Sequence, residues 1–393
     1  MPRKLSFLLL VLIIPPSTWS VELTDYTNPD SFYQRASVES RFNMKSGNQD
    51  QTSFQGNLKG DYEVNYSTAP LVLSATSKGF FNTTRGDKDG SPTEKSYNFN
   101  VRGAADKYFD PNSLFLGYGS LELGYRKLVG RNADDPLIKI GAGVGYGRLI
   151  NATPLAEVLR FVEELKEYGL LNTKELSNDT YLELAAIVAR EEEYKSKYGL
   201  TEYKFYWIND LERALQKAGV LKNNTLGTVG VIRVQDVLIE RRITTIRKHG
   251  WLVKAGIGYL ASNYDDTRSD PSLDASFEYA VPFTHKLQFN EFARYSTVLK
   301  GDVTHDFYNQ LSVTYEVSDR IDWENVWDLS LLLPTKDNAE DSITNNFSSS
   351  FRYYISNFID ASVTLNLTKV NDDKPGNDDV DASLMFGITY RIR

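Results

Sequence analysis

The sequence predicts an all-β fold, a transmembrane antiparallel β-barrel of about fourteen strands, with twelve or sixteen also compatible, that carries an inserted α-helical subdomain. Three observations predict it. The chain opens with an export signal, apolar and polar residues alternate along most of its length, and the alternation changes to a helical period between Ile150 and Gly250. The expected division is a signal peptide (1–20), strands one to six (21–150), a helical insertion (151–249) and strands seven to fourteen (250–393).

The first twenty residues have the composition of a secretory signal peptide. Arg3 and Lys4 precede an apolar run at 5–14, and small residues end the segment at Ser20. The apolar run is too short for a membrane-spanning helix, which needs roughly twenty residues. We therefore expect cleavage after Ser20 and export of the remaining chain.

The alternation is clearest in the last segment of the chain, 379–392. Alternate residues are apolar and those between them are mostly polar, which gives a strand one face for lipid and one for water. The apolar set comprises Val380, Ala382, Leu384, Phe386, Ile388, Tyr390 and Ile392. The same pattern recurs near 54–66, 97–102, 321–333 and 359–369, so we expect a closed sheet with lipid outside and water inside.

The lengths of the connections fit a barrel with both termini in the periplasm. The odd-numbered connections, such as 83–93 and 334–341, are the longer ones and are rich in Asp and Gly, whereas even-numbered ones, such as 109–113 and 356–358, are tight. Long extracellular loops and short periplasmic turns are typical of outer-membrane barrels.

The composition excludes several other classes of protein and site. The chain has no cysteine, so neither disulfides nor thiolate metal sites are expected. Its net charge of -8 provides no basic surface for nucleic acid. Only 41% of the residues are apolar, which is compatible with a membrane barrel because only alternate residues of each strand face lipid.

Apolar residues in the insertion recur at helical spacing. The first stripe consists of Leu155, Val158, Leu159, Val162 and Leu165. Further helices are expected near 182–188, 203–218 and 231–247. About a hundred residues in several helices can bury a small core of their own. We expect a periplasmic subdomain, with a plug inside the lumen as the alternative placement.

Two stretches at the ends of the barrel are similar to a known family. They are 37–51, which contains the turn Ser46, Gly47 and Asn48, and 369–392, which contains Asp372, Pro375 and Asp379 and closes with 386–392. On these residues the chain resembles the bacterial salt-induced outer-membrane proteins, whose barrel domain has no assigned activity. The resemblance implies an outer-membrane barrel, whereas the helical insertion is not typical of the family.

The closing residues also resemble the signal that the β-barrel assembly machinery reads. Gly387, Tyr390 and Ile392 have its spacing, although Arg393 stands where a terminal aromatic residue is usual. The resemblance implies that this machinery inserts the chain into the membrane.

Three histidines, His249, His285 and His305, limit the choice of a general base. An outer-membrane phospholipase pairs a serine with a histidine, and Ser296 could face His305 across a hairpin near 300–301. Ser296 falls on the lumen side of the alternation and His305 on the lipid side, so a dyad would need a bulge. His249 follows a basic helix end and His285 lies in a tight turn, so we expect no catalytic residue.

Charged residues recur on the polar face of the strands and are candidates for lining the lumen. The basic candidates, from strands one to seven, are Arg35, Arg41, Lys59, Arg102, Arg126, Lys139 and Lys254. The acidic candidates, from strands eight to eleven, are Asp274, Glu278, Asp306, Glu316, Asp322, Glu324 and Asp328. Opposed walls would set a transverse field across a wet channel. A lattice of ion pairs that fills the lumen is an equal alternative, because acidic residues such as Glu63 interrupt the basic side.

Glycines share the inward positions of the sixth and seventh strands. They are Gly141, Gly143, Gly145, Gly147, Gly256 and Gly258. This spacing predicts sharp barrel curvature, with a seat for the root of the insertion as the alternative.

Acidic loops near 265–270 and 372–379 lack the ligand spacing of a calcium loop, so no metal or cofactor is expected. A basic cluster at the end of the insertion, Arg241, Arg242, Arg247 and Lys248, could meet anionic headgroups or a periplasmic partner. The alternative is pairing with neighbouring acidic side chains on the helix surface.

These patterns favour a non-enzymatic outer-membrane protein, either a narrow porin-like channel for small hydrophilic solutes or an envelope-stabilising barrel. The second hypothesis is a membrane anchor that presents the helical insertion to a periplasmic partner, and the third is a lipid-modifying enzyme. The expected partners are outer-membrane lipid, lipopolysaccharide and the assembly machinery, without nucleic acid.

Overall fold

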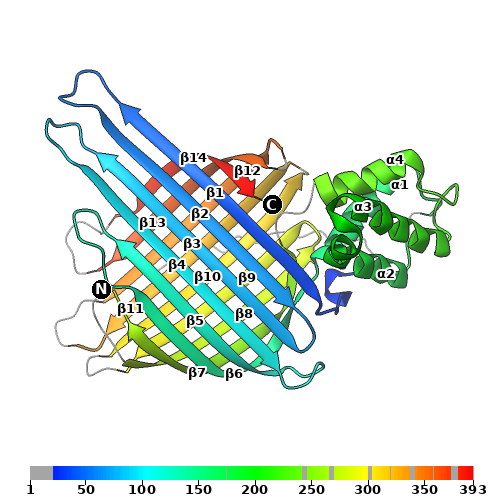
Figure 1. Ribbon diagram of the computed structural model, residues 1–393, viewed down its shortest axis with the longest axis horizontal. Coiled ribbons are helices and arrows are strands. Elements are labelled where there is room, and N and C mark those ends of the chain that lie inside the picture. Colours follow the sequence, from blue (N-terminus) through cyan, green and yellow to red (C-terminus); the bar gives the residue numbers. More distant parts are fainter. Residues whose placement is uncertain are drawn as a thin grey trace.

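The computed structural model shows a closed barrel of fourteen antiparallel strands (Figure 1). It describes residues 21–173, 175–240, 246–264, 270–299, 303–318, 320–336, 341–356, 358–372 and 379–392. Each strand pairs with its neighbours in the sequence, β6 pairs with β7 across the insertion, and β1 pairs with β14. The predicted fold class and strand number are confirmed, while the expected signal peptide lies outside the described residues.

The strands are long enough to cross a membrane at a tilt. They are β1 (Ser31–Lys45), β2 (Ser53–Ser67), β3 (Leu71–Arg85), β4 (Thr93–Tyr108), β5 (Phe115–Lys127), β6 (Leu137–Asn151), β7 (Lys248–Ser262), β8 (Asp270–Thr284), β9 (Leu287–Val298), β10 (Thr304–Ser318), β11 (Ile321–Pro334), β12 (Ser342–Tyr354), β13 (Ile359–Asn371) and β14 (Asp381–Ile392). The shortest have 12 residues, and about 9–11 tilted residues span the hydrocarbon layer of a bilayer.

Large apolar side chains remain exposed on the outer face of the sheet. Phe42 is 67% exposed, Ile257 68% and Phe386 70%. Cross-strand partners share a face, and the register places apolar residues beside apolar ones, as with Phe99 opposite Tyr125. A water-soluble protein would bury such an extensive apolar surface. The outer face therefore has the character of a surface in contact with lipid.

Aromatic residues of this outer face gather near both ends of the barrel. At the end that carries the insertion, Tyr146 lies between Phe115 and Trp251, with ring centroids 4.6 and 5.5 Å apart. At the other end Tyr97 contacts Tyr125, with centroids 5.6 Å apart. Phe115 and Tyr125 begin and end the apolar part of β5, which at about 3.3 Å per residue and a tilt of about 40° is roughly 25 Å tall.

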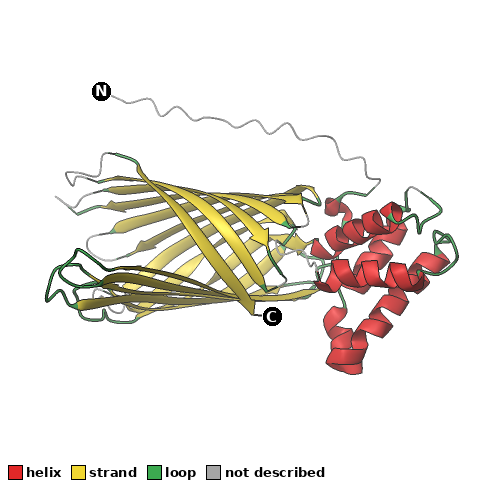
Figure 2. Ribbon diagram, turned by 90° about the horizontal axis from the view of Figure 1, so that it is seen from above, coloured by secondary structure: helices red, strands yellow, loops and turns green. Residues whose placement is uncertain are grey.

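The insertion folds into helices beyond the end of the barrel rather than inside it (Figure 2). They are α1 (Thr153–Glu167), α2 (Asn178–Val188), α3 (Glu191–Lys217), α4 (Gly227–Gln235) and the π-helical turn η2 (Asp236–Glu240). Trp207 of α3 is fully buried among Leu155, Leu184 and Leu211, and its indole donates a hydrogen bond of 2.9 Å to the carbonyl of Ile187. The subdomain therefore has a core of its own.

Two helix boundaries differ from the predictions. The helix expected from 203 begins at Glu191, and Gly199 interrupts it with a φ of 77°, because glycine adopts this left-handed conformation at little cost. The helix expected over 231–247 begins at Gly227 and changes to a π-helical turn at Asp236; 241–245 lie outside the described residues. Among the described helices, none has the length and apolar character that crossing a bilayer requires.

The seam between β1 and β14 is the shortest strand pairing of the barrel. It extends only from Ala36 opposite Ile392 to Ser40 opposite Ile388, whereas β1 pairs with β2 along its full length. A cavity of about 670 Å³ lies beside the seam and is lined by Phe42, Phe351 and Phe386 among others.

Candidate functional site

The charged candidates occupy the strand face opposite the exposed apolar residues. Lys254 of β7 reaches Asp106 of β4, with 2.6 Å between Nζ and Oδ2, although β5 and β6 lie between these strands. Only a concave face allows a side chain to span two intervening strands, so this face is the interior of the barrel. The register places Glu278, Glu324 and Asp328 on the same face.

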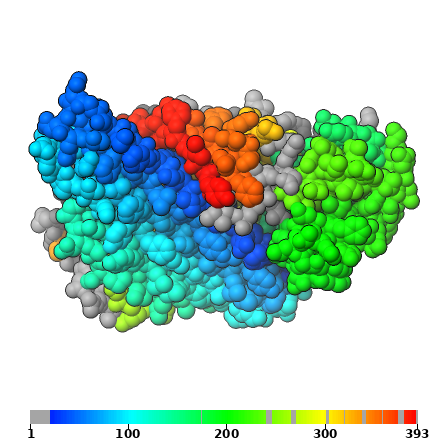
Figure 3. All heavy atoms as spheres, turned by 45° about the horizontal axis from the view of Figure 1, so that its top comes forward, coloured from blue at the N-terminus to red at the C-terminus, as the bar shows by residue number. Residues whose placement is uncertain are grey.

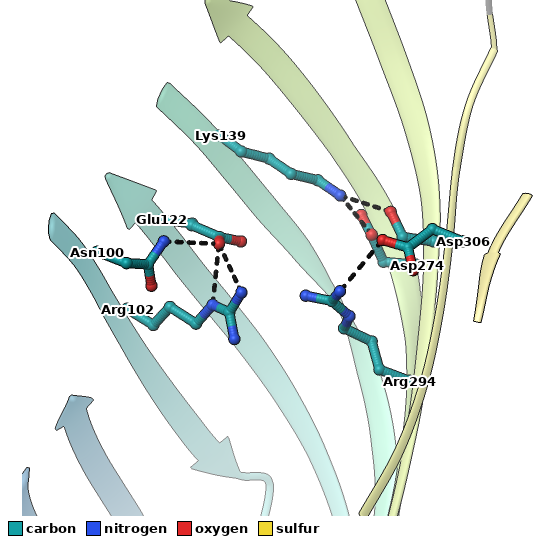
Figure 4. A network of polar contacts seen from close by, with 8 residues as sticks. Asn100, Arg102, Glu122, Lys139, Asp274, Arg294 and Asp306 are labelled. Carbon is teal, nitrogen blue, oxygen red and sulfur yellow. Dashed lines mark hydrogen bonds and ion pairs between the residues drawn. The ribbon is translucent and has the colours of Figure 1, made fainter. Parts of the chain in front are cut away.

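Two neighbouring clusters of polar and charged side chains lie on the inner face of the barrel (Figure 4). Arg102 donates hydrogen bonds of 2.9 and 2.7 Å to Oε1 of Glu122, which also accepts a bond of 3.0 Å from Asn100. On the adjacent strand β6, Lys139 stands opposite Glu122 in the register, forms an ion pair with Asp274 and donates to Ser296 at 2.9 Å. Arg294 completes the second cluster by pairing with Asp306 at 3.2 Å.

Several basic candidates pair with acidic residues of their own wall. Arg35 binds Glu63 at 2.6 Å, Lys59 binds Asp61 at 3.2 Å, and Arg41 contacts Glu39. Arg126 likewise pairs with Asp134, a residue that the sequence analysis did not consider. These contacts weaken the transverse field that opposed walls would create and agree with the lattice alternative for this side.

One carboxylate of the acidic wall, Asp328, accepts hydrogen bonds from neutral donors. Asp328 accepts hydrogen bonds from the hydroxyl of Tyr308 at 2.6 Å and from Gln310 at 2.8 Å. Neither donor carries a charge, so the negative charge of Asp328 is not cancelled by these contacts. The arrangement is therefore mixed, because ion pairs hold Asp274 and Asp306 whereas Asp328 binds neutral donors.

Solvent reaches the two sides of the lumen unequally. The side chains of Arg35, Lys59 and Arg102 are exposed over 53%, 56% and 52% of their surface, whereas those of Lys139 and Lys254 are exposed over only 18% and 14%. Water thus has access along β1 to β4, while the interior along β6 and β7 is packed.

The inward glycines make room for this packing. A Cβ atom on Gly256 would lie 2.6 Å from the hydroxyl of Tyr118 and would overlap the carbonyl oxygen of Ala142, and one on Gly258 would lie 2.6 Å from Asp274. A side chain at Gly256 would therefore collide with the backbone of β6, whereas one at Gly258 would displace lumen side chains. The sequence pattern predicted sharp curvature or a seat for the root of the insertion, and it did not predict the side chains that fill this space.

The helical subdomain is held to the mouth of the barrel by a buried charge cluster (Figure 3 shows the subdomain seated there). Arg160 of α1 forms an ion pair with Glu316 of β10, and Arg247 lies 3.6 Å from the same carboxylate. Arg247 is 1% exposed, and its Nε donates to the carbonyl of His285 at 2.8 Å. Burial lowers the pKa of Arg247 to about 10, so the guanidinium stays charged at neutral pH.

Glu316 and Asp322 therefore differ from the other lumen candidates. Both are buried, at 5% and 8% exposed, and Asp322 accepts a hydrogen bond from Tyr354. Glu316 binds the helical subdomain instead of lining a water-filled wall, because α1 brings Arg160 into the mouth. Alternation could place Glu316 on the inner face but could not show what covers it.

The segment that follows the expected cleavage site packs between barrel and helices. Val21, Leu23 and Tyr26 belong to the core of the helical subdomain, and the carbonyl of Tyr26 contacts Nε2 of His249 at 2.8 Å. Burial raises the pKa of the Tyr26 hydroxyl to about 12. This segment had no predicted role, since it carries no periodic pattern.

His305 and Ser296, the pair considered above, do not form a catalytic dyad. His305 contacts the hydroxyl of Tyr295 at 2.7 Å on the outer face, and Ser296 binds Lys139 on the inner face, so the expected separation of Ser296 and His305 is observed. His285 lies 3.5 Å from Glu163 of α1. Burial alone would raise the pKa of Glu163, but the hydrogen bond and charge of His285 outweigh it and hold that pKa below its ordinary value.

Some of the predicted features lie outside the described residues. They are Arg241 and Arg242 of the basic cluster, the hairpin tip at 300–302 and most of the acidic loops, 265–269 and 373–378. Within the part of the chain that the structure describes, no group of three or more His, Asp or Glu side chains is arranged to hold a metal ion.

Fold and interior together define a class of protein, a fourteen-stranded barrel with an apolar outer face, a charged lumen and a helical cap on one mouth. No known protein family and no curated protein matches the chain. Among solved structures it is similar to CdiB from Escherichia coli, with 7% identity, coverage of 91% of this chain and 63% of CdiB, and a TM-score of 0.41. The chain thus spans less than two thirds of CdiB.

Two further similar structures come from Acinetobacter baumannii. The outer membrane protein Omp33 shares 9% identity over 93% of this chain and 99% of its own, with a TM-score of 0.31. OccAB1 shares 8% identity over 93% and 95% of the two chains, with a TM-score of 0.32. The likeness concerns the barrel fold alone.

Proposed function

We propose that the protein is a bacterial outer-membrane channel for small hydrophilic solutes, with its periplasmic mouth covered by the helical subdomain. Its placement in a membrane is supported by the exposed apolar face and by the two groups of aromatic residues that bound it. Side chains of this amphipathic type gather at both membrane interfaces of outer-membrane barrels. The expected export signal agrees with this location.

One observation carries the channel proposal. Arg35, Lys59 and Arg102 each keep more than half of their side-chain surface accessible although they point into a closed barrel. Because an ionic side chain is costly to bury without water, this side of the lumen is hydrated. The packed side along β6 and β7 narrows the passage, which favours small solutes.

Planar-bilayer recording of the mature full-length chain tests the proposal. We expect stepwise currents from protein whose folding is verified by heat-modifiable mobility on gels. The Arg102→Glu variant should shift the reversal potential in a salt gradient toward cation preference, whereas Lys217→Glu on the exposed surface of α3 should leave it unchanged. Folded protein that carries no current would contradict the channel and leave the envelope-stabilising barrel.

A second function, presentation of the helical subdomain to a periplasmic partner, is favoured by a different observation. Leu200 and Phe205 of α3 are 78% and 70% exposed, although the subdomain has a well-packed core. Large apolar side chains that stay exposed on a folded subdomain are typical of protein contact sites. Replacement of 153–246 by a short turn between Asn151 and Lys248 should preserve conductance in a channel but abolish the envelope phenotype of an anchor.

This proposal makes the protein non-enzymatic and gives it lipopolysaccharide, outer-membrane lipid and the assembly machinery as partners. A lipid-modifying activity, the third hypothesis, would need a base, and the opposed faces of Ser296 and His305 argue against that dyad. Activity that survives substitution of His249, His285 and His305 together would exclude histidine-dependent chemistry. Membership of the salt-induced family is proposed on the sequence resemblance alone.

A further inference from the structure

Polar side chains interrupt the apolar outer face on one wall of the barrel, β9 to β12. They are Glu291 of β9, Asn309 of β10, Asn325 of β11, and Asn345 and Ser349 of β12. Glu291 lies between the outer-face aromatics Phe289 and Tyr295 of the same strand, well inside the apolar height of the barrel. On β4 to β8 the outward positions between the aromatic groups hold only apolar residues and glycine.

The strand register shows that these polar residues surround an apolar centre. Trp327 stands directly opposite Leu311 of β10 and Phe347 of β12. Glu291 is opposite Leu311. Asn325 lies two residues before Trp327 on the same face of β11 and is opposite Ser349. Leu329 lies two residues after Trp327 on the same face and separates Asn309 from Asn345. We call this surface, with its centre and its five polar residues, the Trp327 patch.

The polar groups of the patch already contact one another. Asn309 donates a hydrogen bond of 3.3 Å to Oε1 of Glu291, and the indole of Trp323 donates one of 3.0 Å to Ser349. A carboxamide has two N–H donors and an oxygen acceptor, so one such bond uses only part of its capacity. Hydrocarbon supplies no donor or acceptor for the remainder, and a carboxyl group in lipid carries a further cost.

We propose that the Trp327 patch is the surface through which the protein pairs with a second copy of this chain, in a two-fold arrangement. In such a pair the same patch lies on both sides, so carboxamides of one copy can both donate to and accept from carboxamides of the other. A central tryptophan with a polar rim is also the usual anatomy of a protein interface. The inference rests on the membrane location proposed above but not on conduction.

Cross-linking between single cysteines tests this pairing directly, because the native chain has no cysteine. Leu311→Cys, Asn325→Cys and Phe347→Cys are placed one at a time in the patch. Val101→Cys on the outer face of β4 is the matched control, since it lies near the middle of a strand whose outward positions between the aromatic groups hold apolar residues and glycine. With a thiol cross-linker in native outer membranes, we expect a covalent dimer from the patch positions and none from Val101→Cys.

Light scattering of the mature protein in detergent gives an independent measurement. We expect twice the monomer mass, and self-association weakened by about tenfold or more in the triple variant Glu291→Leu, Asn309→Leu, Asn325→Leu. These substitutions make the wall more apolar, so the barrel should still fold in lipid and keep its heat-modifiable mobility. Gln34→Leu with Ser40→Leu on the outer face of β1 should leave the mass unchanged.

A monomeric mass for the native protein together with no patch cross-link would overturn the inference. Equal cross-linking from Val101→Cys, or a covalent product with a different protein, would overturn it as well. Because mass is measured without reference to current, a dimer that does not conduct would contradict the channel and leave the pairing intact. A monomer that conducts would overturn the pairing and leave the channel proposal intact.

Discussion

Lys254 of β7 and Asp106 of β4 form an ion pair of 2.6 Å although β5 and β6 lie between these strands, and the ring of Tyr118 on β5 is 5.5 Å from the same ammonium. The contact braces β4, β5 and β7 from the inside. Both charged side chains are nearly buried, with 14% and 9% of their surface exposed. Removing one partner therefore leaves the other charge in a poorly hydrated place.

We expect Asp106→Asn to lower the free energy of unfolding by about 2 kcal/mol, because it leaves the Lys254 ammonium without its counter-charge. The double variant Asp106→Leu, Lys254→Met should recover most of this loss, since no buried charge remains. Urea unfolding of the barrel in lipid vesicles, followed by tryptophan fluorescence, measures both. The exposed pair Glu183 and Lys217 is the control, and its removal should change stability by less than about 0.5 kcal/mol. An equally small effect at Asp106 would show that water reaches this pair freely.

The helical cap should loosen when Arg160 is replaced by alanine. Among the described residues, Glu316 then keeps Arg247 at 3.6 Å as its ion-pair partner, and α1 keeps the weaker contact of Glu163 with His285. We expect faster trypsin cleavage within the subdomain and a larger or longer-lived current in bilayers. Arg213→Ala, on the exposed surface of α3, is the matched control and should change neither. Unchanged cleavage and current would mean that apolar packing alone holds the cap.

Acid should weaken a second contact between α1 and the barrel, that of Glu163 with His285. The folded-state pKa of Glu163 lies below the ordinary 4.5, so the carboxylate stabilises the docked state above that value and the contribution is lost as the pH falls through the lowered pKa. The protection factors of the α1 amides, which correct for the intrinsic pH dependence of hydrogen exchange, should therefore be lower at a pH of about 4 than at about 6. Glu163→Gln should remove this dependence, and a pH profile that survives the substitution would assign it to another group.

Gly256→Ala should destabilise the barrel by about 2 kcal/mol or more, because the added methyl group would overlap the carbonyl of Ala142 and press on Tyr118. Gly60→Ala is the matched control, since a Cβ atom at Gly60 meets nothing within 4 Å and alanine restricts the unfolded chain. Folding yield into detergent micelles and urea midpoints compare the two. Equal stabilities would show that the β6 and β7 backbones can separate to admit a side chain.

Much of the architecture could be predicted from alternation alone. A period of two needs no long-range information, so the inner position of Arg102 and the outer position of Phe99 follow from their neighbours on the strand. The opposed faces of Ser296 and His305 follow for the same reason. Arg294 shares the inner face of its strand with Asn290 and Ser296 and so carried the same signal, but it was not among the candidates. Its pairing with Asp306 was not predicted.

The helical subdomain was predictable only in outline. Its amphipathic stripes indicated helices, but the interruption at Gly199 and the π-helical turn at Asp236 depend on how the helices pack. The contact of Arg160 with Glu316 joins residues on separate elements, and no local pattern relates them. The role of Tyr26 in the core of the subdomain was equally hidden.

By itself, the sequence determined that each strand has an apolar and a polar side, that the sheet is long enough to close, and that a helical unit interrupts it, because these properties reside in neighbouring residues. Only the tertiary structure decided which charged side chains pair inside the lumen, what covers the mouth, and where polar residues gather on the outer wall. Those relationships arise when closure of the barrel brings distant strands together, and the energy of a charge or an amide depends on the partners and the solvent that it finds there.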